Sequence, residues 1–473
     1  MDLMQDFTKA SNTAIISDLH LCEAEPVNAQ FPLWKKYKTR EFFYDSELVS
    51  FLELIEKKAN GQKVELILNG DVFDFDSCMR LPERPTFKIS WLEKKRGLYP
   101  RSERSVFKIQ QILKDHPTFI SGLRNFILKG HHIIFVIGNH DLEMHFSDVQ
   151  SEIIQSLNLP GELRKSIRFV EWFYISNQDT LIEHGNQYDP YCVCEDPVNP
   201  FVKGYNYLHL KIPFGNLATR YMVNGMGFFN PHSDANYIMT FKDYIRFFMK
   251  YMFRAQPDLV FVWFFGSITT LFQSFVSQLG SPVRNPLSIE DKIQNIAIKS
   301  NAEPRMVREL RELFVNPAAR NPFLLMRELW LDRAFLLLLG LFFLYQIMTS
   351  MSSLFGISIW WGLLPALPLP PFFLFYSKSI TSRVSYYKEV DEKILSTIGA
   401  ITKVNRIVFG HTHKPKHEIV GPIEHLNSGT WSPAFSDVEC TKSIGKKTYV
   451  WISKDPTAGE GSSRKAELCT FSA

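Results

Sequence analysis

A chain of 473 residues is too long for one typical compact domain, so we expect a globular domain and a substantial second region. Its formal net charge of +4 argues against a dedicated nucleic-acid-binding protein but permits anionic substrates or an anionic membrane surface. The 40 Phe and 9 Trp residues are many for a soluble protein, and their concentration in the middle of the chain points toward lipid.

The first residues and the cysteines bear on the cellular compartment. The opening MDLMQDFTKASN has neither a basic start nor an apolar run, so we expect no signal peptide and a cytoplasmic globular domain. The six Cys residues lack paired CxxC spacing and are interpreted as reduced thiols. Cys192 and Cys194 are spaced as a soft-metal pair would be, but partners at zinc-site spacing are missing, which disfavours that site.

Short apolar runs that end in polar or glycine-containing turns are typical of buried strands, and the first part of the chain repeats them: TAIISDLH, VELILNGD, HHIIFVIGNHD and DTLIEHGN. Helical spacing separates them, as in SELVSFLELIEKK and SVFKIQQILKDH. The alternation stops and returns near the end of the chain with NRIVFGHTH, IEHLNSGTW and KKTYVWISK. The fold prediction is therefore α/β, as a layered α+β domain that is split by a long insertion.

These patterns give the domain boundaries. We assign residues 1–195 to the first part of this split α/β domain and residues 396–455 to its second part. Residues 196–395 form a mostly helical insertion. The small and polar composition of residues 456–473 predicts a disordered tail.

The insertion holds the most hydrophobic stretches of the chain. Residues 334–351 carry no charge and are long enough to span ~30 Å of hydrocarbon as a helix. Residues 354–376 are also uncharged, so residues 334–376 predict a membrane hairpin, whose second leg four prolines make kinked or re-entrant. The alternative is a hairpin buried in a protein core.

Residues 259–279 are a third uncharged stretch, diluted by Ser, Thr and Gln. Because motifs before and after the insertion must build one site, the chain crosses a membrane an even number of times or not at all. Three full spans are thereby excluded, and we expect residues 259–279 to be interfacial or packed against the hairpin. The preceding YIMTFKDYIRFFMKYMF fits either a membrane-surface helix or an ordinary amphipathic helix.

Polar clusters follow five of the predicted strands. Asp18 and His20 come directly after TAIIS, and an extended chain would point residues i and i+2 to the same side. Because such strand ends meet at one edge of a sheet, we expect the five clusters to share a cleft. The other four clusters are Asp71 with Asp74, Asn139 with His140 and Asp141, His184 alone, and His411 with His413.

Each cluster alone has an ordinary structural explanation. Gly-Asp and Gly-Asn are common turn dipeptides, and a single His is usually a hydrogen-bonded polar residue. Five clusters that each follow an apolar strand are instead the pattern of one shared metal site. The mixed nitrogen and oxygen ligands suit Mn, Fe or Zn better than Mg alone.

The motifs DLH, GDVFD, GNHD, HG and GHTH resemble, as a set, those of the calcineurin-like metallophosphoesterases. The resemblance implies a metallophosphoesterase β-sandwich flanked by helices, and hydrolysis of a phosphoester or pyrophosphate bond with two divalent ions, first of all Mn, with Fe or Zn as alternatives. It implies that His140 lies beside the substrate phosphate, with Asp141 and Asp74 orienting their neighbours. The ligands implied are Asp18, His20 and His413 at one ion, Asn139, His184 and His411 at the other, and Asp71 between both.

A closer resemblance narrows the substrate. ISDLHLCEAEP, GDVFD and GHTHKP are similar to the UDP-diacylglucosamine pyrophosphatases of lipid A synthesis, which act at the cytoplasmic membrane surface. That family has Arg where this chain has His140, and it usually lacks an insertion of this size. The resemblance implies a lipid-linked or nucleotide-lipid substrate that is reached from the cytoplasmic face of a membrane. It also implies that this membrane is the inner membrane of a bacterium.

Two basic segments, PLWKKYKTREFF and RLPERPTFKISWLEKKRGLYPRSER, fit attraction of a phosphorylated headgroup, although a solvated basic surface explains most of their residues equally simply. Two other functions are open from the sequence. A soluble-substrate phosphodiesterase or protein phosphatase would use the insertion only as an anchor, whereas a binding module would keep the metal fold without turnover. The complete ligand set disfavours the binding module. We expect no nucleic-acid partner, and the sequence leaves the oligomeric state open.

Overall fold

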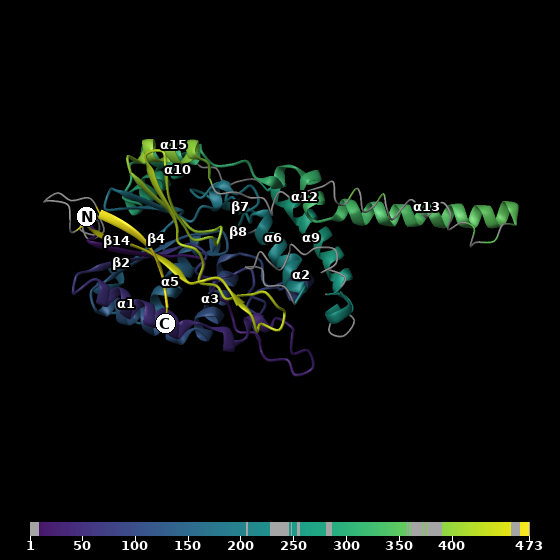
Figure 1. Cartoon of the computed structure of the whole chain (residues 1–473), viewed down its shortest axis with the longest axis horizontal. Coiled ribbons are helices and arrows are strands. Elements are labelled where there is room, and N and C mark those ends of the chain that lie inside the picture. Colours follow the sequence, from purple (N-terminus) through teal and green to yellow (C-terminus); the bar gives the residue numbers. More distant parts are fainter. Residues whose placement is uncertain are drawn as a thin grey trace.

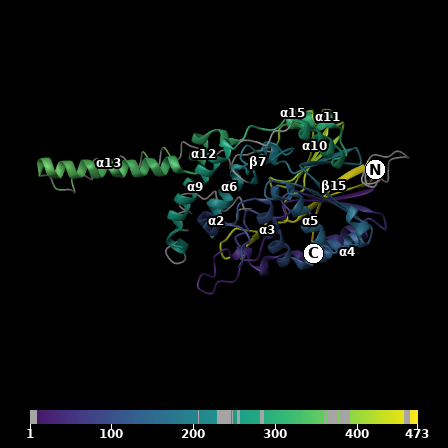
Figure 2. The ribbon, with the colours of Figure 1, turned by 180° about the vertical axis from the view of Figure 1, so that it is seen from behind.

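Two β-sheets packed face to face form the centre of the molecule (Figure 1). The computed structural model describes most of the chain: residues 9–204, 207–227, 246, 248–252, 256–280, 286–356, 358, 361, 372, 376, 390–455 and 464–472. Helices lie on the outer faces of both sheets, and one long helix projects away from this body (Figures 1 and 2).

The first sheet is built on the strands that precede the first three motifs. β1 (Asn12–Ile16), β2 (Val64–Asn69) and β3 (His132–Val136) run parallel, and β4 (Ile167–Val170) continues the sheet. On the other side of β1, β14 (Thr448–Lys454) joins it antiparallel from the end of the chain. The sheet therefore combines strands from both sides of the insertion.

The second sheet combines the two parts of the chain in the same way. β9 (Arg406–Phe409) lies between β6 (Thr180–Glu183) and β11 (Ile423–Asn427), and the three are parallel. β5 (Phe173–Ser176) and β10 (Lys416–Val420) are antiparallel strands at the two edges. The buried strands expected from the apolar runs are confirmed, and so is their division by an insertion.

The layer between the sheets explains why the strands are apolar on both faces. β2 reads VELILN, and all six of its residues are buried. Ile67, Ile134, Ile182, Val408 and Val450 belong to one fully buried cluster between the sheets. A strand that is covered on both faces must be apolar on both faces, which produces continuous rather than alternating hydrophobic runs.

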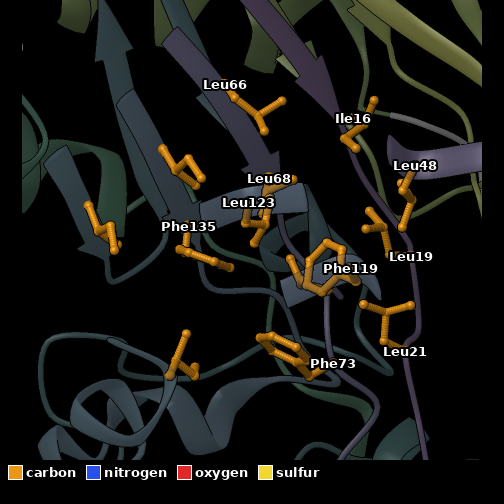
Figure 3. Packing of buried hydrophobic residues seen from close by; sticks show 14 of the residues in the cluster. Ile16, Leu19, Leu21, Leu48, Leu66, Leu68, Phe73, Phe119, Leu123 and Phe135 are labelled. Atoms are coloured by element: carbon orange, nitrogen blue, oxygen red, sulfur yellow. The ribbon is translucent and has the colours of Figure 1, made fainter. Parts of the chain in front are cut away.

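Amphipathic helices cover the outer face of the first sheet. α1 (Asp45–Lys58) buries Leu48, Phe51 and Ile55, which fall on one stripe because their spacing matches the helical repeat. Side chains from the helices and strands interleave in this cluster (Figure 3). The other helices on this face are α3 (Ser102–Asp115), α4 (Pro117–Leu128) and α5 (Ser147–Ser156).

The outer face of the second sheet shows that residues 196–395 are not one uniform insertion. α10 (Pro286–Lys299) and α11 (Pro304–Arg311) lie within that range, yet they pack on this sheet beside α15 (Glu392–Thr402). Ile296 and Val307 are buried against strand residues of the sandwich. These two helices complete the α/β/β/α layers, so the insertion consists of two shorter pieces around them.

The expectation of a disordered tail over residues 456–473 is wrong for residues 464–470, which form a strand. β15 (Arg464–Thr470) pairs antiparallel with β14 and forms the edge of the first sheet. Arg464 and Ala466 alternate with exposed neighbours, as in a half-buried strand. The buried Arg464 guanidinium bonds to Asp179, a pairing between residues far apart in sequence that composition cannot reveal.

The helices of the two insertion pieces gather at one end of the sandwich (Figure 1). α9 (Leu259–Leu279) packs on α6 and α12, and the base of α13 contacts it. α6 spans Phe214–Tyr221, α12 spans Pro322–Glu328 and α13 spans Leu331–Phe355, and these pieces also hold the short η9 (Phe248–Met252).

α13 extends away from the body, and none of its most apolar 18 residues is buried (Figure 1). It and α9 are the two described helices that are long and apolar enough to cross a membrane. At the base of α13, Arg333 lies over the Trp330 ring at 4.6 Å, and Trp330 is 46% exposed. Tryptophan is enriched at the interfaces between membranes and water.

The second leg of the predicted hairpin, residues 354–376, lies largely outside the described residues. Its last residue is described: the Tyr376 hydroxyl donates a hydrogen bond to Asp332 Oδ2 at 3.0 Å. Asp332 belongs to the first turn of α13, so the chain is back at the foot of this helix by Tyr376. Most of YIMTFKDYIRFFMKYMF also lies outside the described residues.

Candidate metal centre

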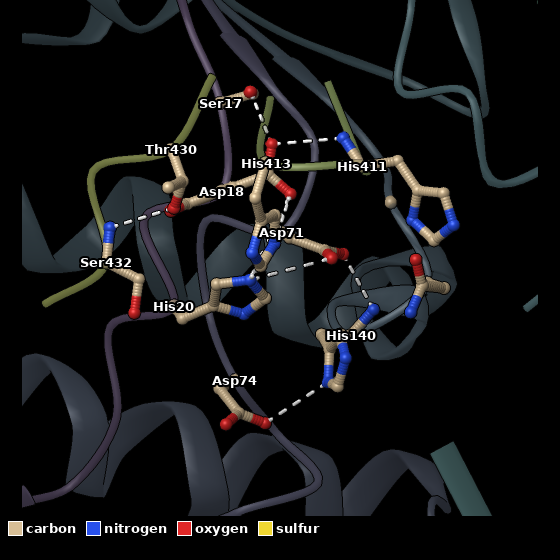
Figure 4. A network of polar contacts seen from close by, with 12 residues as sticks. Ser17, Asp18, His20, Asp71, Asp74, His140, His411, His413, Thr430 and Ser432 are labelled. Carbon is tan, nitrogen blue, oxygen red and sulfur yellow. Dashed lines mark hydrogen bonds and ion pairs between the residues drawn. The ribbon is translucent and has the colours of Figure 1, made fainter. Parts of the chain in front are cut away.

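Five loops bring the sequence clusters together at the carboxyl ends of β1, β2, β3, β6 and β9. Figure 4 shows the rings of His20, His140 and His413 around the carboxylates of Asp18 and Asp71. The backbone joins these loops, since Asp18 N donates to Gly70 O at 3.1 Å and His20 N donates to Asp71 O at 2.8 Å. The side chains of the five clusters therefore lie together where the sheet edges meet.

The convergence of Asp18 and His20 does not arise from an extended chain, as the alternation argument supposed. β1 ends at Ile16, and both residues adopt left-handed backbone conformations beyond it, with φ of 55° and 49°. The same conformation occurs at three further members of the site: Asp71, His411 and His413. Such conformations are unfavourable for non-glycine residues and persist where the surrounding structure imposes them, which is common at functional sites.

The first group of possible ligands is Asp18, His20 and His413, whose candidate donor atoms lie within 4.8 Å of one another. His413 Nε2 is 3.1 Å from Asp18 Oδ1 and 3.3 Å from His20 Nε2. The second oxygen of Asp18 accepts a hydrogen bond from the His411 amide at 3.1 Å. Asp18 is thus held by one oxygen while the other faces the two imidazoles.

The second group is Asp71, His184 and His411, within the same distance limit of 4.8 Å. His184 Nε2 lies 3.1 Å from Asp71 Oδ2, which is also 3.9 Å from His20 Nε2. The other oxygen of Asp71 accepts from the His140 amide at 2.8 Å. Asp71 therefore lies between the two groups, where a carboxylate with two oxygens can bridge two ions.

The polar atoms of the centre fit a cation. Asp18 Oδ1, Asn139 Oδ1 and His184 Nε2 are buried and make no hydrogen bond to a described residue. His184 Nδ1 is 2.9 Å from Asn69 O, a contact that leaves Nε2 as the lone-pair atom. Burial alone would lower the pKa of His184, but Asp71 and Asp18 raise it to about 9, because this cluster of carboxylates favours positive charge. A divalent ion satisfies the same demand.

His140 lies at the edge of this centre, with a partly exposed ring. Its Nδ1 is 3.5 Å from both Asp74 and Asp76. Burial would lower the pKa of His140, but Asp71, Asp74 and Asp76 together raise it well above its usual value. These carboxylates therefore favour the imidazolium form of the ring, in which both nitrogens are donors.

Asp141 orients the backbone of the neighbouring loops. One Asp141 oxygen accepts from Gly138 N at 2.6 Å and the other from Val72 N at 2.8 Å. Burial and the neighbouring Asp71 raise the pKa of Asp141 to about 7. Asp141 thus ties the loop after β2 to the loop after β3, while Asp74 and Asp76 contact the ring.

Three functional-site residues were missed from the sequence. Asp189 Oδ2 is 3.0 Å from His411 Nε2, and its place five residues after His184 was the only available signal. Asp76 is the next carboxylate after Asp74, two residues further along the chain. Asn216 lies in the insertion helix α6, and its side chain donates to Asn139 O at 2.8 Å and to Asp76 Oδ2. No spacing rule connects Asn216 with a site whose other members precede or follow it by dozens of residues.

Part of the first basic segment is built into the site wall rather than solvated. Lys38 is buried, and its ammonium donates to Ser77 O at 2.6 Å. Ser77 in turn donates its backbone amide to Asp74 at 3.0 Å. Lys38 also lines a small cavity beside His20 and Asp74. In contrast, Lys94 and Lys95 of the second basic segment are exposed.

Comparison with known families agrees with this geometry. The family model described as calcineurin-like phosphoesterase matches residues 11–216, which include β1 to β6 and the first four ligand clusters. No curated protein matches the chain. The chain therefore carries a calcineurin-like phosphoesterase domain, which implies metal-dependent hydrolysis of phosphoesters.

Proposed function

We propose that the protein is a two-metal hydrolase of phosphoester or pyrophosphate bonds in a lipid-linked or nucleotide-lipid substrate, acting at the cytoplasmic face of a membrane. The observation that carries the two-metal proposal is the placement of Asp71 between two groups of possible ligands. The proposed ligands are Asp18, His20 and His413 at one ion, and Asn139, His184 and His411 at the other, with Mn as the first candidate metal.

The proposed roles follow from the chemistry of each residue. Two bound divalent ions polarise phosphoryl oxygens and lower the pKa of an attacking water. The imidazolium of His140 donates a hydrogen bond to the phosphoryl group or a proton to the leaving oxygen. Asp74 and Asp76 hold that ring from its other side. Asp189 orients His411, as carboxylates commonly do for metal-binding histidines.

The lipid part of the proposal rests on α13. In water its exposed Leu and Phe side chains would form an apolar surface far beyond what soluble proteins carry, whereas lipid accepts such a surface. The described 25 residues rise about 37 Å, enough to reach across a bilayer core. The return of the chain to Asp332 at Tyr376 supports a hairpin that leaves both parts of the catalytic domain on one side.

Hydrolysis of two substrates by purified, manganese-loaded protein tests the proposal. We expect UDP-diacylglucosamine, dispersed in detergent, to be cleaved far faster than a soluble aryl phosphodiester, with Asp71→Ala as the blank. Activity on the aryl ester alone would contradict the lipid substrate while leaving a phosphodiesterase whose hairpin is only an anchor. If the wild-type protein cleaved neither substrate faster than the Asp71→Ala blank does, the proposed function itself would be contradicted.

A further inference from the structure

α9 is an amphipathic helix with its polarity reversed. Beyond Leu259 in its first turn, the buried residues of α9 are small or carry hydroxyls: Gly266, Ser267, Thr270 and Ser274. Its opposite face carries large apolar side chains that are between 52% and 69% exposed: Phe261, Phe265, Phe272, Phe275 and Leu279. Their spacing of four, seven, three and four residues places all five on one stripe of the helix.

The buried face packs closely because its residues are small. A Cβ atom at Gly266 would lie 2.8 Å from Tyr221 O, so α9 touches the backbone at the end of α6. The Thr270 hydroxyl is satisfied within the helix itself, since it donates to Gly266 O at 2.8 Å. Helices in lipid pack through small residues, because burial of apolar surface between helices gives no free energy there. Hydroxyl groups on such helices commonly donate to a carbonyl oxygen of their own helix.

The position of α9 beside α13 indicates which partner covers its exposed Phe and Leu side chains. Phe264 on its flank lies 6.2 Å from Phe335 near the foot of α13, so the exposed surfaces of the two helices are continuous. In Figure 1, α9 runs across the direction in which α13 leaves the body. If α13 enters a bilayer, α9 therefore lies along the bilayer surface. It has no charged residue over its 21 residues, which leaves acyl chains as the matching partner for the stripe.

We propose that α9 lies in the plane of the membrane interface, with the Phe261–Leu279 stripe embedded among lipid acyl chains. It is a surface-lying helix rather than a membrane span. This inference deepens the membrane association proposed above, but it stands on the reversed polarity of α9 rather than on the hydrophobicity of α13. Since α6 packs on α9 and carries Asn216, the embedded helix seats the metal centre at the lipid surface.

Depth measurement in the full-length protein tests the orientation. A dansyl-bearing amino acid replaces Phe261, Phe272 or Leu279, one at a time, in protein reconstituted into phosphatidylethanolamine and phosphatidylglycerol vesicles. These positions are exposed, so the substitutions spare the packing of α9. Phe261 and Leu279 are about 27 Å apart along the helix. Quenching is compared between lipids that carry a nitroxide at the headgroup or deep in the acyl chain.

An in-plane helix gives equal depths at all three positions, each quenched most strongly by the shallow nitroxide. A deeper position at Phe272 than at Phe261 and Leu279 would overturn the inference in favour of a span. The same label at Ile419 on β10, which is 70% exposed, serves as the control and should escape quenching.

A label at Leu338 on α13 separates this inference from the membrane proposal. Quenching at Leu338 without quenching on α9 would overturn the inference alone, and a dimer seen by native mass spectrometry would then identify a second copy as the cover. Quenching on α9 without quenching at Leu338 would uphold the inference and contradict the membrane hairpin. Absence of quenching at both helices would overturn both.

Discussion

α1 and α9 are both amphipathic helices, and they present opposite faces to the protein. α1 buries Leu48, Phe51 and Ile55 and exposes Glu53 and Lys57, as a helix facing water does. α9 buries serine and threonine and exposes phenylalanine. In water, each large apolar side chain left outside forgoes roughly 1.5–3 kcal/mol of burial free energy. The comparison teaches that α1 turns charged residues outward, whereas α9 turns apolar residues outward, as the proposed contact with lipid requires.

The largest expected effect comes from a substitution in the candidate metal centre of the sandwich. Asp71→Ala should abolish metal binding and hydrolysis together, because Asp71 faces both groups of ligands. Metal content by mass spectrometry and activity are measured on the same sample. Full activity with only one ion retained would contradict the bridging role. Asp148→Ala, which changes an exposed carboxylate remote from the site, is the control.

Deletion of residues 334–376 tests the proposed membrane hairpin and leaves the sandwich intact. The intact protein should resist extraction from membranes by alkaline carbonate, whereas the deletion variant should be extracted while keeping its metals. α9 would still hold the variant loosely at the surface, so its release needs the carbonate wash. An intact protein that is already soluble without detergent would contradict the proposed hairpin.

His140→Ala should keep both metals and lose about 10²–10⁴-fold in turnover, the usual contribution of a positioned proton donor. Burial lowers the pKa of His140, but Asp71, Asp74 and Asp76 raise it well above the usual range. The active imidazolium is therefore present below that raised pKa and lost as the pH climbs through it. Wild-type turnover should fall on the alkaline side, and the variant should lack that fall. Normal turnover in the variant would contradict the assigned role.

Asn216→Ala tests the contact between the insertion and the metal centre, because Asn216 lies on the insertion helix α6 and bonds to residues of the site. We expect about 10–100-fold weaker metal binding, the usual loss when a partner of a ligand is removed. Asn224→Ala is the matched control, since Asn224 bonds to the backbone oxygen of Asp76 rather than to a ligand residue. Equal metal affinities in the two variants would show that α6 only supports the fold. Metal titration monitored by calorimetry gives the readout.

Arg464→Met tests the edge strand of the sandwich. Loss of a buried arginine that is paired with Asp179 should lower the free energy of unfolding by about 3 kcal/mol, and Lys465→Ala on the exposed side should change it little. Burial raises the pKa of Asp179, but Arg464 lowers it overall. The contribution of the pair is therefore present above about pH 4 and lost as the pH falls through the lowered pKa. In urea unfolding at several pH values, the free energy of unfolding of the variant should lack this acid-sensitive contribution.

The strands and ligand clusters could be predicted because each depends on a short stretch of sequence. A strand buried on both faces is a run of apolar residues, and the loop after it carries its polar residues at fixed offsets. α10, α11 and β15 were misassigned because their partners are distant in sequence: Ile296 packs on the second sheet, and Arg464 pairs with Asp179. Asn216 escaped for the same reason.

By itself, the sequence determined a split α/β metallophosphoesterase domain with five ligand clusters and a long uncharged stretch, since local patterns and motif order carry that information. Only the tertiary structure decided how the site is held. It gave Asp18 and His20 left-handed backbones, put Asp74 and Asp76 rather than Asp141 against His140, and placed α6 between the metal centre and α9. These features depend on which distant segments meet in space. Packing of the whole chain settles that, and no local pattern records it.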